Sequence, residues 1–336
     1  MPLCAVRGSV NCDEYFNVKA IGRPGETISS FGYTKGVGGK GANQAVAVAR
    51  AARGAAGDVH FIGAVGADGQ WIRAQLAVWG VDVAQLADTG DAPPTGRALI
   101  QVAEDGENAI LLFPGANFDE SYEDRAPSPG SYLPAGTTHL LLQNEITLRS
   151  THAALASAKA DPSAPVTTVF NPSPMPSHEQ LAAFPWHQID WLVINEGEGQ
   201  VLYSHLHGTQ APGSVDALLT ALTTLPKFDK INIICTLGGS GLAACVLGGG
   251  GRRLVRLPAA KVQDIRDTTG AGDTFTGYFV RGLMELEEAK VAAEGAALEQ
   301  ALRRAIQAAG MCVEKRGTVD SIPHREDVES RLSSSQ

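Results

Sequence analysis

The chain has 336 residues, 44% of them hydrophobic, and a formal net charge of −9 at pH 7. Because nucleic acids and anionic membranes bind basic surfaces, this balance argues against both as partners. No apolar run reaches the length of a membrane span. Five cysteines without a CxxC spacing favour a reducing compartment, the cytoplasm or else the nucleus, over a disulfide framework or zinc site.

Short apolar runs alternate along the chain with longer Ala-, Leu- and Gln-rich segments. The runs predicted to be strands are residues 3–6, 59–65, 139–142, 166–170, 191–194 and 231–236. The segments predicted to be helical are residues 43–53, 70–79, 151–160, 215–225 and 274–286. This alternation predicts βαβ units and hence an α/β fold, with a doubly wound, mostly parallel sheet flanked by helices on both faces.

Two stretches depart from this pattern. Residues 15–35 are polar with a Pro24-Gly25 turn, and residues 95–117 alternate around Asp105-Gly106, which is a hairpin signal. We interpret them as extra strands, inserted at about 14–36 and 95–117, that leave the main sheet and form a small β lid. Residues 127–134 are predicted to be a loop and residues 248–251 a turn between two strands. The whole chain is expected to be one domain with a disordered tail at 331–336.

The first glycine-rich segment, residues 36–43, contains GxGxxG. The context of a dinucleotide site is missing, because residues 29–35 are polar and Asp58 precedes the next apolar run instead of ending it. The segment is not a Walker A loop, since glycine follows Lys40. The plain alternative is a helix start with permissive glycines. A lysine and an asparagine among the glycines favour a backbone that approaches a ligand closely.

The second glycine-rich segment, Asp-Thr-Thr-Gly-Ala-Gly-Asp at 267–273, is the most informative stretch. Two glycines allow a tight turn, and the helix expected to follow contributes unpaired N–H groups and the positive end of its dipole. Together they predict an anion site suited to a phosphoryl group in transfer. A carboxylate beside such a site needs a chemical reason, so Asp273 is predicted to take a proton from an attacking hydroxyl.

The block at 38–45, Gly-Gly-Lys-Gly-Ala-Asn-Gln-Ala, the block at 267–273 and the order of the segments between them resemble the ribokinase branch of the PfkB family of sugar kinases. The resemblance covers about residues 8–322. The first block points to that branch and the second is shared across the family. The resemblance implies a ribokinase-like fold and transfer of a phosphoryl group from ATP to the 5-hydroxyl of D-ribose. It also implies Mg²⁺, an activating K⁺ ion and a homodimer formed through the β lid.

The resemblance also implies roles for individual residues. The sugar would be held by Asn11, Asp13, Gly39, Lys40, Gly41, Asn43 and Glu145, with Asp273 as base and the N–H groups of Gly270, Ala271 and Gly272 as the anion hole. ATP would contact Asn195, Thr236, Leu237, Gly238, Gly239, Ser240, Gly241, Gly272, Asp273 and Ile306. Magnesium would be held by Asn195 and, through water, Glu198, and potassium by Asp267, Thr269, Cys312, Lys315, Gly317 and Ser321.

Several alternatives stay open at this point. Glu196 and Glu198 also fit ordinary acids at a helix N-terminus, and residues 236–241 fit a plain β-turn. Ile306 falls where the family often carries an asparagine near the adenine, which bears on nucleotide selectivity. The rival functions are a PfkB-type kinase for another sugar or a nucleoside, a non-catalytic sugar or nucleotide sensor, and, ranked lower, an NAD-dependent oxidoreductase. An intact base and anion hole argue against a sensor.

Overall fold

The computed structural model describes residues 1–54, 57–119 and 132–334. Its larger sheet has the strand order β13-β12-β11-β10-β9-β8-β1-β4-β5, parallel from β5 to β11 and antiparallel at β12 and β13. The strands are β1 (Cys4–Arg7), β4 (Val59–Val65), β5 (Leu86–Asp88), β8 (His139–Leu142), β9 (Thr167–Phe170), β10 (Trp191–Asn195), β11 (Asn232–Thr236), β12 (Leu242–Gly248) and β13 (Gly251–Leu257). The predicted mostly parallel sheet is confirmed.

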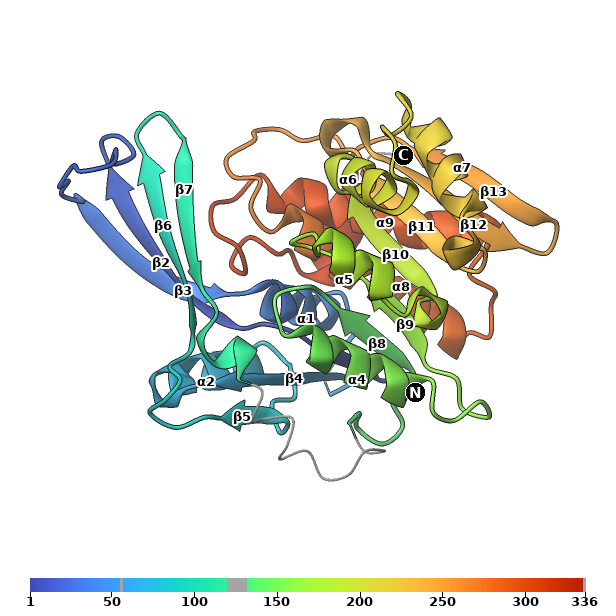
Figure 1. Cartoon of the computed structure of the whole chain (residues 1–336), viewed down its shortest axis with the longest axis horizontal. Helices are drawn as coiled ribbons and strands as arrows, with labels where there is room; N and C mark the ends of the chain where they lie inside the picture. Colours follow the sequence, from blue (N-terminus) through green and yellow to red (C-terminus); the bar gives the residue numbers. More distant parts are fainter. Residues whose placement is uncertain (55–56, 120–131, 335–336) are drawn as a thin grey trace.

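Helices cover both faces of this sheet (Figure 1). One layer holds α1 (Lys40–Arg50), α2 (Gln70–Val78), α8 (Ala271–Glu288), α9 (Gly295–Cys312) and α10 (Arg325–Ser333); the other holds α4 (Leu148–Ala158), α5 (His178–Ala183), α6 (Glu196–His207) and α7 (Val215–Thr224). The strands serve both layers because their side chains alternate: Leu141 of β8 packs in the first core, whereas Leu140 and Leu142 pack in the second. The doubly wound arrangement is therefore confirmed.

The direction of winding reverses at β1. The chain passes from β1 to β4 and β5 on one side and then returns to β8 on the other side. In register, Arg7 at the end of β1 lies beside Leu142 at the end of β8. Open α/β sheets bind ligands in the crevice outside the carboxyl ends of the strands at such a reversal. The residues that directly follow β1 and β8 are therefore placed to form a site.

A second sheet, of order β3-β2-β6-β7, projects from one end of the larger sheet (Figure 1). Its strands are β2 (Asn11–Val18), β3 (Gly32–Gly38), β6 (Gly96–Ala103) and β7 (Asn108–Phe113). Gly106, at φ +90°, turns the chain between β6 and β7 at the Asp105-Gly106 signal. The separate lid sheet is confirmed, although β2 and β3 extend beyond the predicted 14–36.

Smaller differences concern the ends of elements. The helix predicted at 43–53 is α1, which starts three residues earlier at Lys40. The predicted turn at 248–251 joins β12 to β13. Residues 331–333, predicted to be disordered, continue α10, where Arg331 pairs with Glu314 at 3.0 Å. Most of the predicted loop at 127–134 lies outside the described residues, as do residues 335 and 336.

Candidate active site

Helix α8 begins at the second glycine-rich segment, with Gly270 as its N-cap. Gly270 has φ +79°, and an added Cβ would lie 3.1 Å from Cγ2 of Thr318, so the position requires glycine. Gly270 supplies no side-chain cap, and the first N–H groups of a helix have no partner within it. The Ala271 N–H makes only a long contact, 3.4 Å, with the Thr268 carbonyl oxygen. This turn has the geometry of an anion site.

Asp273 lies in the first turn of α8 and is only 7% exposed. Asn43 Nδ2 donates to its Oδ2 and Gln44 Nε2 donates to its Oδ1, both at 2.9 Å. Both amides come from α1, so the two glycine-rich segments of the sequence meet at this carboxylate. Each carboxylate oxygen has further lone pairs, and the two amides fix its direction. The arrangement suits a base held in one orientation.

The amide of Gln44 is part of a buried network that the sequence analysis missed. Gln44 is fully buried; its Oε1 accepts from Gln143 Nε2 at 2.7 Å, and its Nε2 also lies 3.1 Å from Asn171 Oδ1. Asn171 in turn donates to the carbonyl oxygen of Val193 at 2.9 Å. Gln143 and Asn171 directly follow β8 and β9, and polar residues at strand carboxyl ends are the signal that would have found them.

The lid contributes Asn11 and Asp13, each 7% exposed, from the start of β2. A Cβ at Gly38 would overlap the Asp13 carboxylate, so glycine is required opposite it. Asn117 Nδ2 donates to Asn11 Oδ1 at 2.8 Å and to the Val10 carbonyl oxygen at 3.1 Å, which orients Asn11. Asn117 was not among the predicted site residues. Its position at the end of the 95–117 stretch gave no sign of this role.

Glu145 joins the first glycine-rich segment to the end of β1. Its Oε2 accepts from Ser9 Oγ at 2.6 Å and from the Lys40 N–H at 2.9 Å. Gly39 has φ +86°, and a Cβ at Gly41 would lie 2.5 Å from the Ser9 nitrogen. These glycines are therefore needed for close approach of two backbone segments, and Glu145 is joined to the segment that holds Gly39, Lys40, Gly41 and Asn43.

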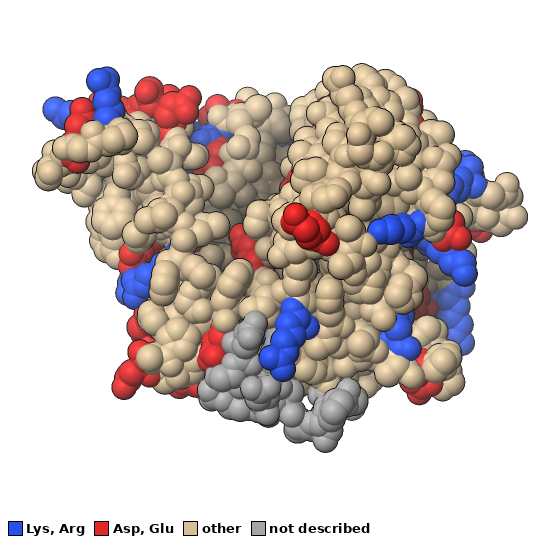
Figure 2. Space-filling view, in the orientation of Figure 1, with Lys and Arg blue, Asp and Glu red and all other residues tan. Residues whose placement is uncertain are grey.

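Charged groups converge on the space between the lid and α8. Burial raises the pKa of Asp13 to about 7, helped by the charge of Glu145, while a hydrogen bond from Tyr15 acts in the opposite direction. The pKa of Lys40 is raised mainly by the charge of Asp273, against the effect of burial and with help from Glu145 and Glu198. In the space-filling view a recess separates the lid from the larger part of the molecule (Figure 2). Carboxylates and amides of this kind suit a ligand rich in hydroxyl groups.

Two of the residues predicted to contact the nucleotide, Asn195 and Thr236, end neighbouring strands. The register of β10 and β11 places Asn195 beside Thr236. Asn195 and Glu198 form a capping box at the start of α6: the Glu198 N–H donates to Asn195 Oδ1 at 2.8 Å, and the Asn195 N–H donates to Glu198 Oε2 at 2.9 Å. The reading of Glu198 as an acid at a helix N-terminus therefore holds, whatever else it binds. Ile306 of α9 packs against the core and is only partly buried.

The segments predicted to hold potassium are adjacent. Asp267 accepts the Thr269 N–H at 2.9 Å through Oδ1 and the Gly317 N–H at 3.1 Å through Oδ2. Cys312 Sγ lies 3.8 Å from the Thr269 carbonyl oxygen and 3.0 Å from Ser321 Oγ. The turn before α8 is thereby joined to the segment 312–321. Within the described ranges, no cluster of three or more His, Cys, Asp or Glu side chains has the arrangement of a metal site.

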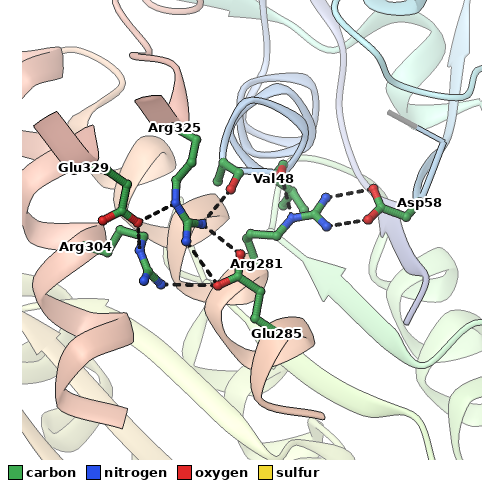
Figure 3. Close-up of polar contacts among 8 residues, drawn as sticks. Val48, Asp58, Arg281, Glu285, Arg304, Arg325 and Glu329 are labelled. Carbon is green, nitrogen blue, oxygen red and sulfur yellow. Dashed lines mark hydrogen bonds and ion pairs between the residues drawn. The ribbon is translucent and has the colours of Figure 1, made fainter. Parts of the chain in front are cut away.

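Buried ion pairs fix the other half of α8 (Figure 3). Arg281 donates to the Val48 carbonyl oxygen of α1 at 3.1 Å and pairs with Asp58. One turn later Glu285 pairs with Arg304 of α9 and Arg325 of α10. The arginines are nearly buried, whereas Asp58 and Glu285 are about 30% exposed. Asp58, which directly precedes β4, thus holds α8 on the sheet.

In sequence, this chain is similar to carbohydrate kinases. A family model described as pfkB family carbohydrate kinase matches residues 1–325. A ribokinase of Haemophilus influenzae is 34% identical over 326 residues, covering 96% of this chain and 95% of the relative.

Among the described residues, every helix is too short or too polar to span a membrane.

Solved structures of ribokinases are also similar to this chain over nearly its whole length. A ribokinase of Cryptococcus neoformans var. grubii in complex with ADP matches at 44% identity and TM-score 0.83, covering 99% of this chain and 100% of that one. An Arabidopsis thaliana ribokinase with ribose and ATP matches at 28% identity and TM-score 0.76, covering 98% of both chains. A Methanocaldococcus jannaschii nucleoside kinase, 20% identical, shares the fold at TM-score 0.78 over 99% of both chains. The family match and the full-length relatives show that the chain belongs to the PfkB family of carbohydrate kinases.

Proposed function

We propose that this protein transfers the γ-phosphoryl group of ATP to the 5-hydroxyl of D-ribose. The observation that carries the proposal is the position of Asp273, which Asn43 and Gln44 hold at the open N-terminus of α8. The buried Asn11 and Asp13 supply polar groups for a small sugar on the lid side. Ribokinases solved with ADP and with ribose and ATP are among the similar structures.

In this proposal the sugar binds through Asn11, Asp13, Lys40, Asn43 and Glu145. Asn43 Oδ1 is buried and has no hydrogen-bond partner among the residues that the structure describes, so a sugar hydroxyl would satisfy it. Asp273 accepts the hydroxyl proton as the oxygen attacks the γ-phosphorus. The N–H groups of Gly270, Ala271 and Gly272 neutralise the transferring oxygens, since positioning and electrostatics supply most of the catalysis of phosphoryl transfer.

The nucleotide would lie along the other side of the 267–273 loop. The nucleotide would contact Asn195 and Thr236, the turn 237–241, Gly272 and Ile306. Magnesium fits the oxygen donors at the start of α6, because Glu198 uses Oε2 in the cap and its second carboxylate oxygen can face a metal-bound water. A bound Mg²⁺ ion would neutralise phosphate charge.

A potassium ion fits the junction of the two segments joined by Asp267. The donors are oxygens, as a hard cation requires: the Asp267 carboxylate, the carbonyls of Thr269, Cys312, Lys315 and Gly317, and the Ser321 hydroxyl. The junction already orders the turn before Gly270 through hydrogen bonds from Thr269 and Gly317. A bound cation would tighten the same junction without contacting the sugar.

An acceptor screen tests the proposed reaction. ADP release would be followed over D-ribose, 2-deoxyribose, D-fructose and adenosine, each with and without potassium. D-Ribose should give the highest kcat/KM, and potassium should raise it. A preference for adenosine would instead support a nucleoside kinase, and an absence of turnover with every acceptor would support a sensor.

We also propose a homodimer formed through the lid. β7, an edge strand of the lid, exposes Leu111 to 65% and Ile110 to 54%. An exposed apolar strand at a sheet edge favours pairing with another chain. Light scattering at micromolar concentration should give a dimer for the wild type and a monomer for Leu111→Glu. Val78→Glu is the control, because Val78 is 78% exposed on α2 outside the lid.

A further inference from the structure

Tyr15, which is not among the residues assigned to the site above, connects the lid to the loop behind the α8 N-terminus. It follows Asp13 by two positions on β2, and the alternation of a strand puts both side chains on one face. Its hydroxyl lies 3.0 Å from Oγ1 of Thr318. Hydrogen bonding by the same hydroxyl acts to lower the pKa of Asp13. One phenol therefore lies on the same face of the lid as Asp13 and contacts a loop of the larger part of the molecule.

Thr318 lies directly behind the turn that starts α8. It is 6% exposed, and its Cγ2 would be 3.1 Å from a Cβ at Gly270. Ser321 Oγ donates to its carbonyl oxygen at 2.7 Å, and the preceding Gly317 N–H donates to Asp267. Close-packed groups transmit displacements to their neighbours. A shift of Thr318 therefore changes the position of the turn that presents the anion site.

The lid does not need Tyr15 as an anchor. Arg97 of β6 pairs with Glu14 of β2 at 2.7 Å and, outside the lid, with Asp68 just before α2 at 2.6 Å. Lys35 of β3 lies over the ring of Trp71 on α2, 5.0 Å from its centroid. These contacts attach the lid on the side of α2. The contact between Tyr15 and Thr318 is different, because it reaches the segment that borders α8.

On the basis of the proposed function, we infer that Tyr15 is a positioning residue that couples sugar binding at the lid to the placement of the α8 N-terminus. The phenol can donate to Asp13 while it accepts from the Thr318 hydroxyl. A sugar that engages Asp13 then fixes Tyr15, and Tyr15 fixes Thr318 and the turn at Gly270. The acceptor hydroxyl and the anion site are thereby brought into register before the nucleotide reacts.

Hydrogen exchange on the full chain tests the coupling without nucleotide. Saturating D-ribose should slow amide exchange both in residues 11–18 and in residues 312–321 of the wild type. In Tyr15→Phe and Thr318→Val, the sugar should still protect 11–18 but no longer protect 312–321. Tyr33→Phe is the matched control, since its hydroxyl lies on the same lid, 3.5 Å from Glu14 and largely exposed; it should behave as the wild type does.

Kinetics give the second measurement. Loss of one neutral hydrogen bond should lower kcat about three- to tenfold in Thr318→Val, with KM for D-ribose within about twofold of the wild type. Tyr15→Phe and Thr318→Val both remove the same hydrogen bond between Tyr15 and Thr318. The double variant Tyr15→Phe/Thr318→Val should therefore be no slower than the slower single variant. A thermal melt of each variant reports any general loss of folding.

Two outcomes would overturn the coupling: wild-type protection confined to residues 11–18, or independent, multiplicative losses in the double variant. Failure of the proposed function has a different signature. In that case D-ribose would protect neither segment of the wild type and would not be phosphorylated, which would remove the sugar assignment and this inference with it.

Discussion

The first turns of helices α8 and α6 each carry an acidic side chain, but the two acids are held in different ways. Glu198 of α6 closes a capping box with Asn195, three residues before it. Asp273 of α8 accepts from Asn43 and Gln44, about 230 positions earlier in the chain, and the N-cap Gly270 offers no side chain. One helix end is satisfied locally, whereas the other is assembled from distant segments and left open.

Under the proposed function, this difference fits chemistry at the start of α8 rather than at the start of α6. A capping box supplies acceptors to the first N–H groups of its own helix, so α6 needs no ligand to complete it. At α8 the acid is held by buried amides of α1, and the first N–H groups of the helix have no partner within it. The contrast predicts large effects of substitutions around Asp273 and small effects around Glu198.

Asp273→Asn should produce the largest effect. Removal of a general base costs roughly 10²–10⁴ in rate, so we expect turnover to be at least about a hundredfold slower. The variant should fold and bind D-ribose, because an amide can replace the carboxylate in size. Steady-state kinetics and calorimetric titration with D-ribose check the two parts. Asp264→Asn, an exposed position in the preceding segment, should keep normal turnover; near-normal turnover of Asp273→Asn would remove that carboxylate from the mechanism.

Asp13, on the lid side of the same site, should make the stability of the protein depend on pH. Its pKa is raised from 3.8 to about 7 by burial and then by Glu145, so between these values the folded protein without sugar binds more protons than the unfolded chain. Stability should therefore fall as pH rises from about 4 to about 7, by at most about 1.4 kcal/mol per pH unit. Melting curves of the wild type and Asp13→Asn should diverge across this window. Equal slopes in both proteins would show that Asp13 titrates normally.

Gln44→Met tests whether the distant amides matter to the base. The substitution keeps the volume but removes a hydrogen bond to a charged group, which contributes roughly 1.5–3 kcal/mol. We expect kcat to fall about tenfold or more and the free energy of unfolding to fall by about 1–3 kcal/mol, because Gln143 also loses its acceptor. Gln200→Met, on the exposed side of α6, is the control. Unchanged kcat with lowered stability would limit Gln44 to a structural role.

The buried contacts of Gln44 could not be predicted from the sequence. The alternation of strands and helices and the lid were predictable, because periodicity and turn residues are local signals. That the two glycine-rich segments belong to one site was expected only from the resemblance, and the contact of Asn43 with Asp273 was not predicted. The network of Gln44, Gln143 and Asn171 depends on three elements packing at one point, and an amide in an apolar helix carries no local sign of its partner. The same holds for Asn117, whose partners lie 106 and 107 positions away.

Glu198 should give the smallest effect on folding, and a pair of variants separates its two roles. Glutamine can still accept the Asn195 N–H in a capping box, so Glu198→Gln should melt as the wild type does. Glu198→Ala removes the acceptor of the Asn195 N–H but leaves the Asn195 side chain as cap, so it should cost about 0.5–1.5 kcal/mol. If Glu198 also binds a magnesium-bound water, both variants should need more Mg²⁺ for half-maximal activity, since neither keeps the charge. If Glu198→Gln instead leaves the magnesium requirement unchanged, the residue is a helix cap alone, and the contrast between α6 and α8 is complete.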